Sequence, residues 1–517
     1  MNRVSLPLDG VDPEVLGALP AAFAQKHQVF PLQKDERVLR LAVADPLAMA
    51  VFDEIRILTG LSVEPVLVDS SEIREAIDRL YVERLLRETS GADAEVVVQE
   101  EEDIGDLERM AGEATTVRLV NLLFHQAVQE RASDIHVEPF EHELKVRFRV
   151  DGVLREVAAP PKRLQQAIAS RIKLMAGMNI AERRLPQDGR IRFRVSGRDL
   201  DVRVSAMPTV HGESIVMRML DKSSVLFGLE ELGMTEWSGA VFRRLIERPY
   251  GIILVTGPTG SGKTTTLYAA LAEIASPEKK IITIEDPVEY ELPGINQIPV
   301  RPKIGLTFAG GLRSILRQDP DVIMVGEIRD RETAEIAIQA SLTGHLVFST
   351  LHTNDAAGAM TRLLDMGIDP YLVASTVQGV LAQRLVRRIC PECRETHEMD
   401  GRELAAQGLG AAAAEPGTAG SRPVEQLASD PGRVMVFRGR GCSACSGAGF
   451  YGRVGVFELL LVDSAVRELI MKRTASDEIK RCAVSSGMTT LREDGWRKAL
   501  AGVTTVGEVL RATALDD

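Results

Sequence analysis

The chain has 517 residues, and its 45% hydrophobic and 26% charged residues are the balance of an ordinary globular protein. At roughly 150 residues for each domain, this length predicts three or four domains. The formal net charge of −12 disfavours nucleic acid and anionic lipid as partners. The sequence has no apolar run near the ~20 residues that a membrane-spanning helix needs. Its first residues also lack the basic and then apolar pattern of a secretory signal, so we expect an intracellular protein.

The first part of the chain, residues 1–90, predicts a small α/β domain. Strand-like patterns at residues 38–43 and 63–68 lie on either side of helical spacing over residues 47–58. The sequence Asp-Ser-Ser-Glu at residues 69–72 resembles a capping box that opens a further helix. Nothing in these patterns is typical of catalysis, so we expect a docking domain.

An acidic segment follows, and we interpret residues 91–114 as a linker. Between residues 93 and 108 the chain has eight Asp or Glu residues and no Lys or Arg. Carboxylates that repel one another cannot build a core, so a solvated linker is the simplest interpretation.

The next region, residues 115–228, predicts a mixed α/β domain. An amphipathic pattern at residues 117–124 precedes alternating, strand-like patterns at residues 144–150, 191–195 and 200–204. These elements predict a second ordered unit after the linker.

The rest of the chain divides into three regions. Over residues 229–388, apolar runs alternate with helical segments, which predicts a largely parallel sheet flanked by helices. Residues 389–455 contain four of the five cysteines and an Ala/Gly/Pro-rich insertion at residues 405–429. Residues 456–517 have helical spacing and few helix-breaking residues, so we expect a C-terminal helical region.

A phosphate-binding motif stands within the predicted parallel sheet. The sequence Gly-Pro-Thr-Gly-Ser-Gly-Lys-Thr fits the P-loop pattern and lies between a predicted strand at residues 252–255 and a predicted helix at residues 265–275. Its glycines let backbone N–H groups point at phosphate oxygens, Lys263 neutralises the β and γ phosphates, and the Thr264 hydroxyl binds Mg²⁺. The expected ATP-binding residues are Gly257, Pro258, Thr259, Gly260, Ser261, Gly262, Lys263, Thr264 and Thr265.

Acidic residues close two predicted strands near this motif. Glu285 ends the run Ile-Ile-Thr-Ile, and Glu327 follows the run Val-Ile-Met-Val. In an open α/β sheet both would lie at the carboxyl edge where ligands bind, and a carboxylate there can hold Mg²⁺ or orient the attacking water. His345 and His352 lie on either side of a further strand, where polar groups beside a phosphate can act as sensors.

The cysteines predict a metal site. Two C-x-x-C pairs, Cys390 with Cys393 and Cys442 with Cys445, account for four of the five. Two-residue spacing lets two thiolates share one tetrahedral Zn²⁺, and two such pairs complete a closed Cys₄ site. A redox pair would need only one of the two motifs, so we predict a structural zinc and an isolated thiol at Cys482.

Several motifs follow one another in a fixed order along the chain. Besides the P-loop they are Ser-Asp-Ile-His-Val-Glu-Pro at residues 133–139, Ile-Glu-Asp-Pro-Val-Glu-Tyr at 284–290, Gly-Glu-Ile-Arg-Asp-Arg-Glu-Thr at 326–333 and Thr-Leu-His-Thr at 350–353. This set closely resembles the secretion-ATPase superfamily that drives type II secretion and type IV pili. The likeness covers about residues 115–461.

The resemblance implies a fold and a set of active-site roles. Each subunit of a hexameric, ATP-hydrolysing motor would combine a PAS-like N-terminal subdomain with a RecA-like core. By motif, Glu285 would be the water-activating acid and Glu327 the Walker B acid near Mg²⁺. The other residues that the resemblance places around the nucleotide are His345 and His352 of the His box, together with Arg203 and Arg218.

The resemblance also implies partners and a location. It predicts a cytoplasmic homohexamer, held at the inner membrane by platform proteins (a GspL-like cytoplasmic domain and a GspF-like protein) rather than by lipid. The modest N-terminal domain favours a type II secretion motor that extends a pseudopilus, with a type IV pilus assembly motor as the alternative. The acidic balance opposes a DNA translocase, and the intact Lys263, Glu285 and Glu327 oppose a nucleotide-binding scaffold without turnover.

Overall fold

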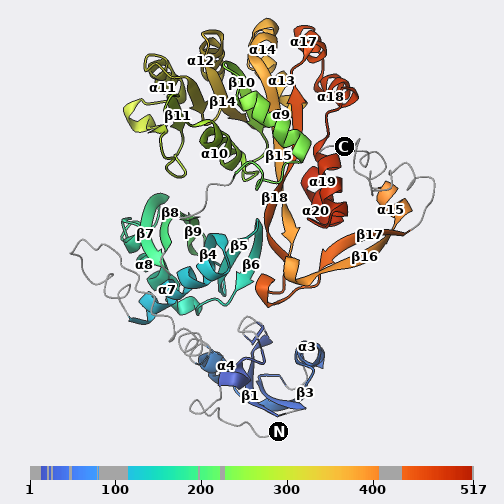
Figure 1. The fold of residues 1–517 in the computed structure, drawn as a ribbon. Helices are drawn as coiled ribbons and strands as arrows, with labels where there is room; N and C mark the ends of the chain where they lie inside the picture. Colours follow the sequence, from blue (N-terminus) through green and yellow to red (C-terminus); the bar gives the residue numbers. More distant parts are fainter. Residues whose placement is uncertain are drawn as a thin grey trace. The chain divides into compact units, whose positions relative to one another are not determined.

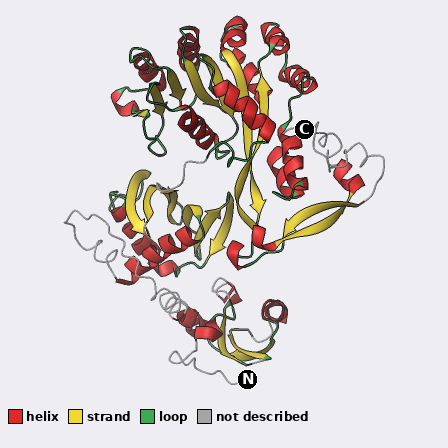
Figure 2. Ribbon diagram, in the orientation of Figure 1, coloured by secondary structure: helices red, strands yellow, loops and turns green. Residues whose placement is uncertain are grey.

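The computed structural model describes residues 13–19, 23–24, 27–35, 37–45, 49–77, 80, 114–195, 198–221, 228–406 and 433–514. They belong to two compact units, Met1–Ser224 and Val225–Asp517. Figure 1 labels their elements and Figure 2 colours them by type. Almost all of the expected linker and most of the Ala/Gly/Pro-rich insertion lie outside the described residues. In the part of the chain that is described, no helix is long and apolar enough to cross a membrane.

The first sheet has three strands in the order β1-β2-β3, with β1 antiparallel and β3 parallel to β2. Its elements are α1 (Pro13–Leu16), β1 (Val29–Lys34), β2 (Val38–Val43), α3 (Met49–Thr59), β3 (Ser62–Leu67) and α4 (Ser70–Ala76). Leu41 of β2 packs with Phe52 of α3, whereas the neighbouring Ala42 packs with Ile73 of α4. Helices therefore cover both faces, and β1 is added to the strands that the sequence predicts.

The second sheet has six strands, all antiparallel to their neighbours, in the order β6-β5-β4-β9-β8-β7. Its elements are α7 (Ala114–Gln129), β4 (Ala132–Pro139), β5 (Leu144–Val150), β6 (Val153–Val157), α8 (Gln165–Met175), β7 (Gln187–Val195), β8 (Arg198–Thr209) and β9 (Gly212–Asp221). Alternate residues such as Phe148 and Val202 are buried and cluster with Phe124 of α7 and Ile172 of α8. One face is therefore apolar and covered by helices, and the other is polar.

The third sheet has seven strands in the order β12-β11-β13-β14-β10-β15-β18. Every neighbouring pair is parallel except β15 with β18, as the alternating apolar runs predict. The strands are β10 (Gly251–Thr256), β11 (Ile281–Glu285), β12 (Asn296–Pro299), β13 (Val322–Val325), β14 (Leu346–Leu351), β15 (Val377–Ile389) and β18 (Phe450–Leu461). The parallel pairing brings the carboxyl ends of β10, β11, β13 and β14 to one edge of the sheet.

Helices cover both faces of this sheet (Figure 1). Ile253 of β10 packs with residues of α9 and α10, and its neighbour Leu254 packs with residues of α11, α12 and α13. The helices are α9 (Glu236–Ile246), α10 (Lys263–Ile274), α11 (Phe308–Ile315), α12 (Arg331–Leu342), α13 (Ala356–Asp365) and α14 (Pro370–Thr376).

The C-terminal part differs from its prediction at one point. Helices begin at Ser464 rather than at residue 456, because residues 456–461 belong to β18 and pair with β15. The run Val-Phe-Glu-Leu-Leu-Leu is nearly continuous in apolar residues, so its pattern alone does not separate a helix from a strand buried on both faces. The helices that follow are α17 (Ser464–Met471), α18 (Ser476–Ser485), α19 (Leu491–Leu500) and α20 (Val506–Thr513).

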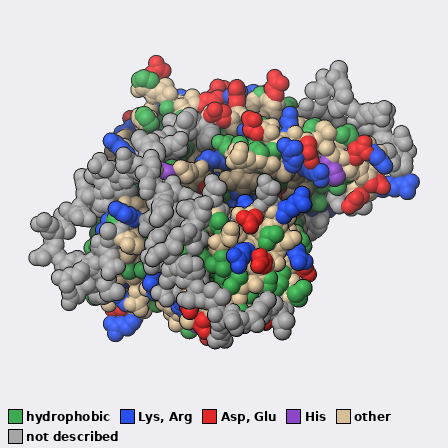
Figure 3. All heavy atoms as spheres, turned by 90° about the horizontal axis from the view of Figure 1, so that it is seen from below, with side chains coloured by type: hydrophobic (Ala, Val, Ile, Leu, Met, Phe, Trp, Pro, Cys, Tyr) green, Lys and Arg blue, Asp and Glu red, His purple; other side chains and the backbone are tan. Residues whose placement is uncertain are grey.

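The cysteine-containing segment lies between β15 and β18. It contains a two-stranded antiparallel sheet with a short helix after its first strand. The elements are β16 (Arg394–Asp400), α15 (Gly401–Ala406) and β17 (Arg433–Gly439). On the face of the molecule that Figure 3 shows, acidic and basic side chains of the described residues are interspersed rather than gathered by sign.

Candidate functional site

The P-loop joins β10 to α10 at the carboxyl edge of the seven-stranded sheet. Gly257 and Gly262 have φ angles of +147° and +89°, which favour glycine. At Gly257 space is also short, since an added Cβ would lie 2.5 Å from the carbonyl oxygen of Gln383. The buried hydroxyl of Ser261 has no hydrogen-bond partner among the described residues, and a phosphate oxygen would supply one. The shape and the donors of this loop therefore fit a phosphate.

Lys263 is the first residue of α10, and the loop itself holds its ammonium group. Nζ donates hydrogen bonds to the carbonyl oxygens of Gly257 (2.8 Å) and Pro258 (3.0 Å). Burial lowers the pKa of Lys263 to about 8, an effect that Glu327 opposes and Arg384 increases. A phosphate in the loop would offer this cation anionic partners in place of neutral carbonyl groups.

Glu327 and His352 stand beside the P-loop at the same edge of the sheet. Glu327 is the second residue after the end of β13, and His352 directly follows the end of β14. The Glu327 carboxylate pairs with Arg329 Nη2 at 2.5 Å, and its other oxygen lies 3.3 Å from Nε2 of His352. Its side chain is 12% exposed, and its charge acts on the ammonium of Lys263. The structure therefore brings together Lys263, Glu327 and His352.

Glu285 ends β11 and is buried behind this group. Its carboxylate accepts hydrogen bonds from the hydroxyls of Tyr268 and Thr283 (2.5 Å for Thr283) and from Nε2 of Gln297 (3.1 Å). Burial raises the pKa of Tyr268, and the charge of Glu285 raises it further, so the phenol stays a donor. The ring of Tyr290 stands edge-on to that of Tyr268, with centroids 4.6 Å apart. These contacts fix the Glu285 carboxylate next to α10.

His345 lies at the opposite edge of the sheet from His352. It precedes the first residue of β14, and its carbonyl oxygen accepts from the N–H of Gly251 at the start of β10. Its Nδ1 is 2.8 Å from the carbonyl oxygen of Ala340. At ~3.3 Å for each strand residue, β14 separates the two histidines by about 20 Å. The structure therefore does not bring His345 to the P-loop.

Arg203 and Arg218 lie opposite each other on β8 and β9, in the first compact unit. They belong to a row of side chains across the six-stranded sheet. Arg218 donates from Nε to the buried Asp134 at 3.1 Å, and Arg149 pairs with the same carboxylate at 3.7 Å. Although it pairs with Asp134, the Arg218 side chain is 59% exposed, so its guanidinium is accessible to solvent on the polar face.

Sequence reasoning missed two polar residues of β15 that adjoin the P-loop. Arg384 is buried, and its Nη2 donates to the carbonyl oxygen of Asn354 at 2.7 Å. Gln383 accepts from the hydroxyl of Thr266 on α10 at 2.7 Å. The signal was present in the sequence, since Gln and Arg interrupt an apolar strand that has helices on both faces.

The four predicted zinc ligands form one group, which we call the Cys₄ cluster: Cys390, Cys393, Cys442 and Cys445. All four sulfur atoms lie within 4.8 Å of one another, with separations of 3.7, 3.8 and 3.9 Å for three of the pairs. A tetrahedron with Zn–S bonds of ~2.3 Å has edges of about 3.8 Å, so the cluster fits zinc. In the metal-free cluster, burial raises the pKa of Cys390 and of Cys393, whereas hydrogen bonds from the N–H groups of Cys442 and Gly449 outweigh burial at Cys445 and lower its pKa to about 6.

Comparisons with known proteins identify the family of the chain. The family model described as "Type II/IV secretion system protein" matches residues 109–511, and that of the "MshEN domain" matches residues 1–106. The type II secretion system protein E of Xanthomonas campestris pv. campestris is 49% identical over 97% of this chain and 85% of its own length. The type II secretion system ATPase E of Vibrio cholerae is 45% identical over 96% of both chains.

Two further comparisons concern a pilus protein and a solved structure. The type IV pilus assembly ATPase PilB of Myxococcus xanthus is 45% identical over 98% of this chain and 88% of its own length. The ATPase DotB of Legionella pneumophila is 21% identical over 80% of this chain and 97% of its own, with a TM-score of 0.54, and it shows the shared α/β ATPase fold. From the family match over most of its length and from these identities, the chain belongs to the type II/IV secretion system protein family and is an ATPase of that family.

Proposed function

We propose that the chain is the ATP-hydrolysing motor of a type II secretion system and acts as a homohexamer that powers pseudopilus assembly and protein export. The main support is the group Lys263, Glu327 and His352 at one sheet edge, in a chain 49% identical to a type II secretion system protein E. The proposed location is cytoplasmic, at the inner membrane. There residues 1–90 would dock on platform proteins, a GspL-like cytoplasmic domain and a GspF-like protein.

The P-loop edge supplies the proposed groups for ATP. Lys263 exchanges its loop carbonyls for β- and γ-phosphate oxygens, and residues 257–265 surround the phosphates. Thr264 and Glu327 are the residues that would hold Mg²⁺, which offsets the negative charge of the transferring phosphoryl group. His352 contacts Glu327 and is therefore placed to respond when that carboxylate changes partners.

In this proposal, a carboxylate and two arginines also act on the γ-phosphate. Glu285 orients the attacking water, for which one of its oxygens must exchange a donor such as Tyr268 or Thr283 for the water molecule. Arg203 and Arg218 are proposed to supply positive charge to the nucleotide. Cations from outside the P-loop suit a reaction in which charge spreads over the transferred group.

The Cys₄ cluster is proposed to hold one structural Zn²⁺. Four thiolates fill a tetrahedral coordination shell and leave no position for a water, so we expect no Lewis-acid catalysis by this metal. Its binding energy would instead organise the segment between β15 and β18.

A type IV pilus assembly motor is the second candidate. The 45% identity to the Myxococcus xanthus pilus assembly ATPase favours it, and that likeness extends over 98% of this chain. Both candidates use the same chemistry and differ in the fibre that the motor extends.

A test of both candidates uses Glu327→Gln, which keeps the shape of the side chain and removes its charge. The purified variant should bind ATP with near-normal affinity and lose turnover by about 10²-fold or more, because the charge acts in the transition state. Glu332→Gln is the control, since this exposed glutamate of α12 pairs with Arg313. In cells that lack the parental gene, secretion of a reporter and piliation are then measured with each variant.

Each outcome decides between the candidates. Loss of secretion with normal pili in Glu327→Gln, and normal behaviour of Glu332→Gln, supports the type II motor. Loss of pili with normal secretion supports the pilus motor. Parental turnover in Glu327→Gln would remove this carboxylate from the mechanism, and intact secretion and piliation would overturn both proposals.

A further inference from the structure

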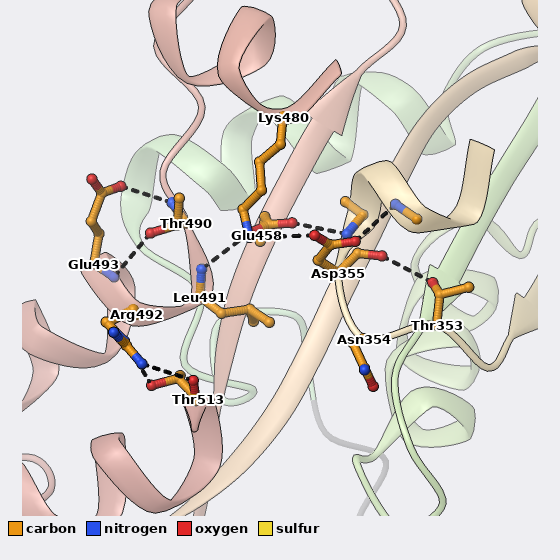
Figure 4. A network of polar contacts seen from close by, with 12 residues as sticks. Thr353, Asn354, Asp355, Glu458, Lys480, Thr490, Leu491, Arg492, Glu493 and Thr513 are labelled. Atoms are coloured by element: carbon orange, nitrogen blue, oxygen red, sulfur yellow. Dashed lines mark hydrogen bonds and ion pairs between the residues drawn. The ribbon is translucent and has the colours of Figure 1, made fainter. Parts of the chain in front are cut away.

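A buried carboxylate lies in β18, outside the P-loop. Glu458 is fully buried (0% exposed) and stands opposite Ala382 of β15. In Figure 4 it occupies the centre of a polar network between the loop after β14 and the C-terminal helices. A charge in this position needs strong partners, because an unpaired buried carboxylate is too costly to keep.

Its partners come from three helices. One carboxylate oxygen accepts the N–H of Ala356 (2.8 Å), and the other accepts the N–H of Leu491 (3.4 Å) and lies 3.8 Å from Nζ of Lys480. Ala356 and Leu491 are the first residues of α13 and α19. The amino ends of helices carry partial positive charge and free N–H groups, so one carboxylate holds two helix ends and one ammonium together.

The start of α13 is continuous with the loop that carries His352. Asp355 caps α13 through the N–H of Gly358 (2.8 Å) and pairs with Lys480 at 3.3 Å. Two residues earlier, Thr353 shares a hydrogen bond of 2.7 Å with the hydroxyl of Thr256, the last residue before the P-loop. The loop between His352 and Asp355 is therefore tied to β10 at one end through Thr353. At its other end Asp355 pairs with Lys480, beside Glu458 (Figure 4).

We infer that Glu458 is a positioning residue for ATP hydrolysis. With Asp355 and Lys480 it forms what we call the Glu458 hub, which fixes the start of α13 and thereby the place of His352 beside Glu327. The hub also joins this loop to α18 and α19, so a displacement of these C-terminal helices is transmitted to the catalytic edge. This inference rests on the proposed role of His352.

A second buried carboxylate of the same unit supplies a matched control. Glu508 of α20 is 3% exposed, and it bonds to the side chains of Arg387 and Arg511 and to the backbone N–H of Arg387. It thus resembles Glu458 in burial, charge and contact with a backbone N–H. Its partners are Arg387 and Arg511. Arg387 lies in the outer part of β15, by which we mean the residues after Arg384, and Arg511 lies on α20. Glu508 should therefore support the fold without setting the place of His352.

The experiment compares Glu458→Gln, Glu508→Gln, His352→Ala and the double variant Glu458→Gln/His352→Ala in the purified full chain. We expect Glu458→Gln to lower kcat by about 10- to 100-fold with ATP affinity within about twofold, because a small misplacement of a catalytic group has this effect. Glu508→Gln should keep kcat even if it melts earlier. In the double variant kcat should equal that of His352→Ala, since the hub acts through His352.

The outcomes separate this inference from the proposed function. If His352→Ala keeps the parental kcat, the proposed role of His352 is wrong. If His352→Ala lowers kcat but Glu458→Gln does not, or if the two effects on kcat multiply in the double variant, the inference is wrong.

A second pair of variants covers the case in which Glu458→Gln fails to fold. Lys480→Met then tests the hub, because it removes the ammonium between Asp355 and Glu458 and leaves both helix ends capped. It should lower kcat at unchanged ATP affinity, and Lys480→Arg should restore part of the rate. Parental kcat in Lys480→Met would overturn the inference.

Discussion

The two large sheets present their polar groups in different places. In the six-stranded antiparallel sheet, buried and half-buried residues alternate along β5, and Arg149 and Arg218 stand on the polar face beside Asp134. In the seven-stranded sheet, every residue of β10, β13 and β14 is buried. In β13 and β14 the charged or titratable groups begin only where the strands end, at Glu327 and His352.

This difference follows from how the sheets are covered. A sheet with helices on one face can carry rows of charges on the other at little cost. A sheet with helices on both faces cannot place a charge within a strand unless that charge is paired, so its chemistry gathers at the carboxyl edge. Glu458 is such a paired charge, because two helix N–H groups and Lys480 surround it. The comparison predicts separable effects for the edge, the open face and the outer part of β15.

The largest effect should come from removing a ligand of the Cys₄ cluster. This substitution tests whether the outer part of β15 folds independently of the ATP-binding edge of the sheet. From Ala382, the last residue that pairs with β10, the chain needs eight residues to reach Cys390, a span of about 25 Å at ~3.3 Å for each residue. Cys393→Ser should abolish zinc binding and destabilise the chain by on the order of a few kcal/mol, because metal binding is coupled to local folding. ATP affinity of the folded fraction should stay within about twofold.

Metal analysis and thermal melting check this prediction. Cys482→Ser is the control, since this thiol lies in α18 outside the cluster. A parental chain that contains no zinc, yet melts at the same temperature as Cys393→Ser, would contradict the zinc assignment. A large loss of ATP affinity would instead show that the outer part of β15 and the edge are coupled.

The next effect is a loss of stability at neutral pH, and it concerns Glu508 of α20, which bonds to Arg387 of β15. Burial alone would raise the pKa of Glu508, but hydrogen bonds from Arg387 and Arg511 bring it down to about 2, below its ordinary value of 4.5. A depressed carboxyl pKa stabilises the fold above pH 4.5, and this stabilisation is lost as the pH falls towards 2. Glu508→Gln should therefore cost about 3 kcal/mol at neutral pH and almost nothing near pH 2. Denaturant unfolding at several pH values measures the difference, and a cost independent of pH would contradict it.

Much of this architecture can be predicted from the sequence because its signals are local. The P-loop spacing, the two C-x-x-C pairs and the apolar runs of the parallel sheet each lie within a short segment. The α/β fold with a P-loop ATPase core is confirmed, and so is the grouping of the four cysteines. Local sequence patterns are enough to predict a feature when all the residues that form it lie in one or two short segments.

The remaining features depend on contacts between distant segments. Glu458 acquires its partners from residues 22 to 102 positions away, and Arg384 donates to Asn354, 30 positions away, so no spacing rule finds these contacts. The separation of His345 from His352 follows from strand direction, since a residue before a strand and a residue after it lie at opposite edges. The pairing of β18 with β15 is equally long-range, and it turns an apolar run with helical spacing into a strand.

A substitution on the polar face of the six-stranded sheet should lower turnover and leave ATP binding intact. Arg218→Gln removes an exposed guanidinium that Asp134 holds, and we expect kcat of the assembled motor to fall by about tenfold with ATP affinity within about twofold. Arg192→Gln is the control on the same face. Arg192 is 70% exposed, and its ion pair with Asp201 is long, at 3.9 Å. Steady-state kinetics and nucleotide titration separate the two quantities. Equal rates for both variants would remove Arg218 from the mechanism.

The smallest effect concerns the edge itself and its response to pH. Burial lowers the pKa of Lys263 to about 8 in the nucleotide-free chain. Below that pH the ammonium is ready to meet phosphate, whereas above it binding must first take up a proton. Between pH 7 and pH 8.5 the protonated fraction falls about fourfold, so ATP affinity should weaken by about the same factor. Calorimetry at pH 8.5 in buffers of different ionisation enthalpy should detect proton uptake on binding. No uptake, together with an affinity independent of pH, would mean that burial does not lower the pKa of Lys263 to this value.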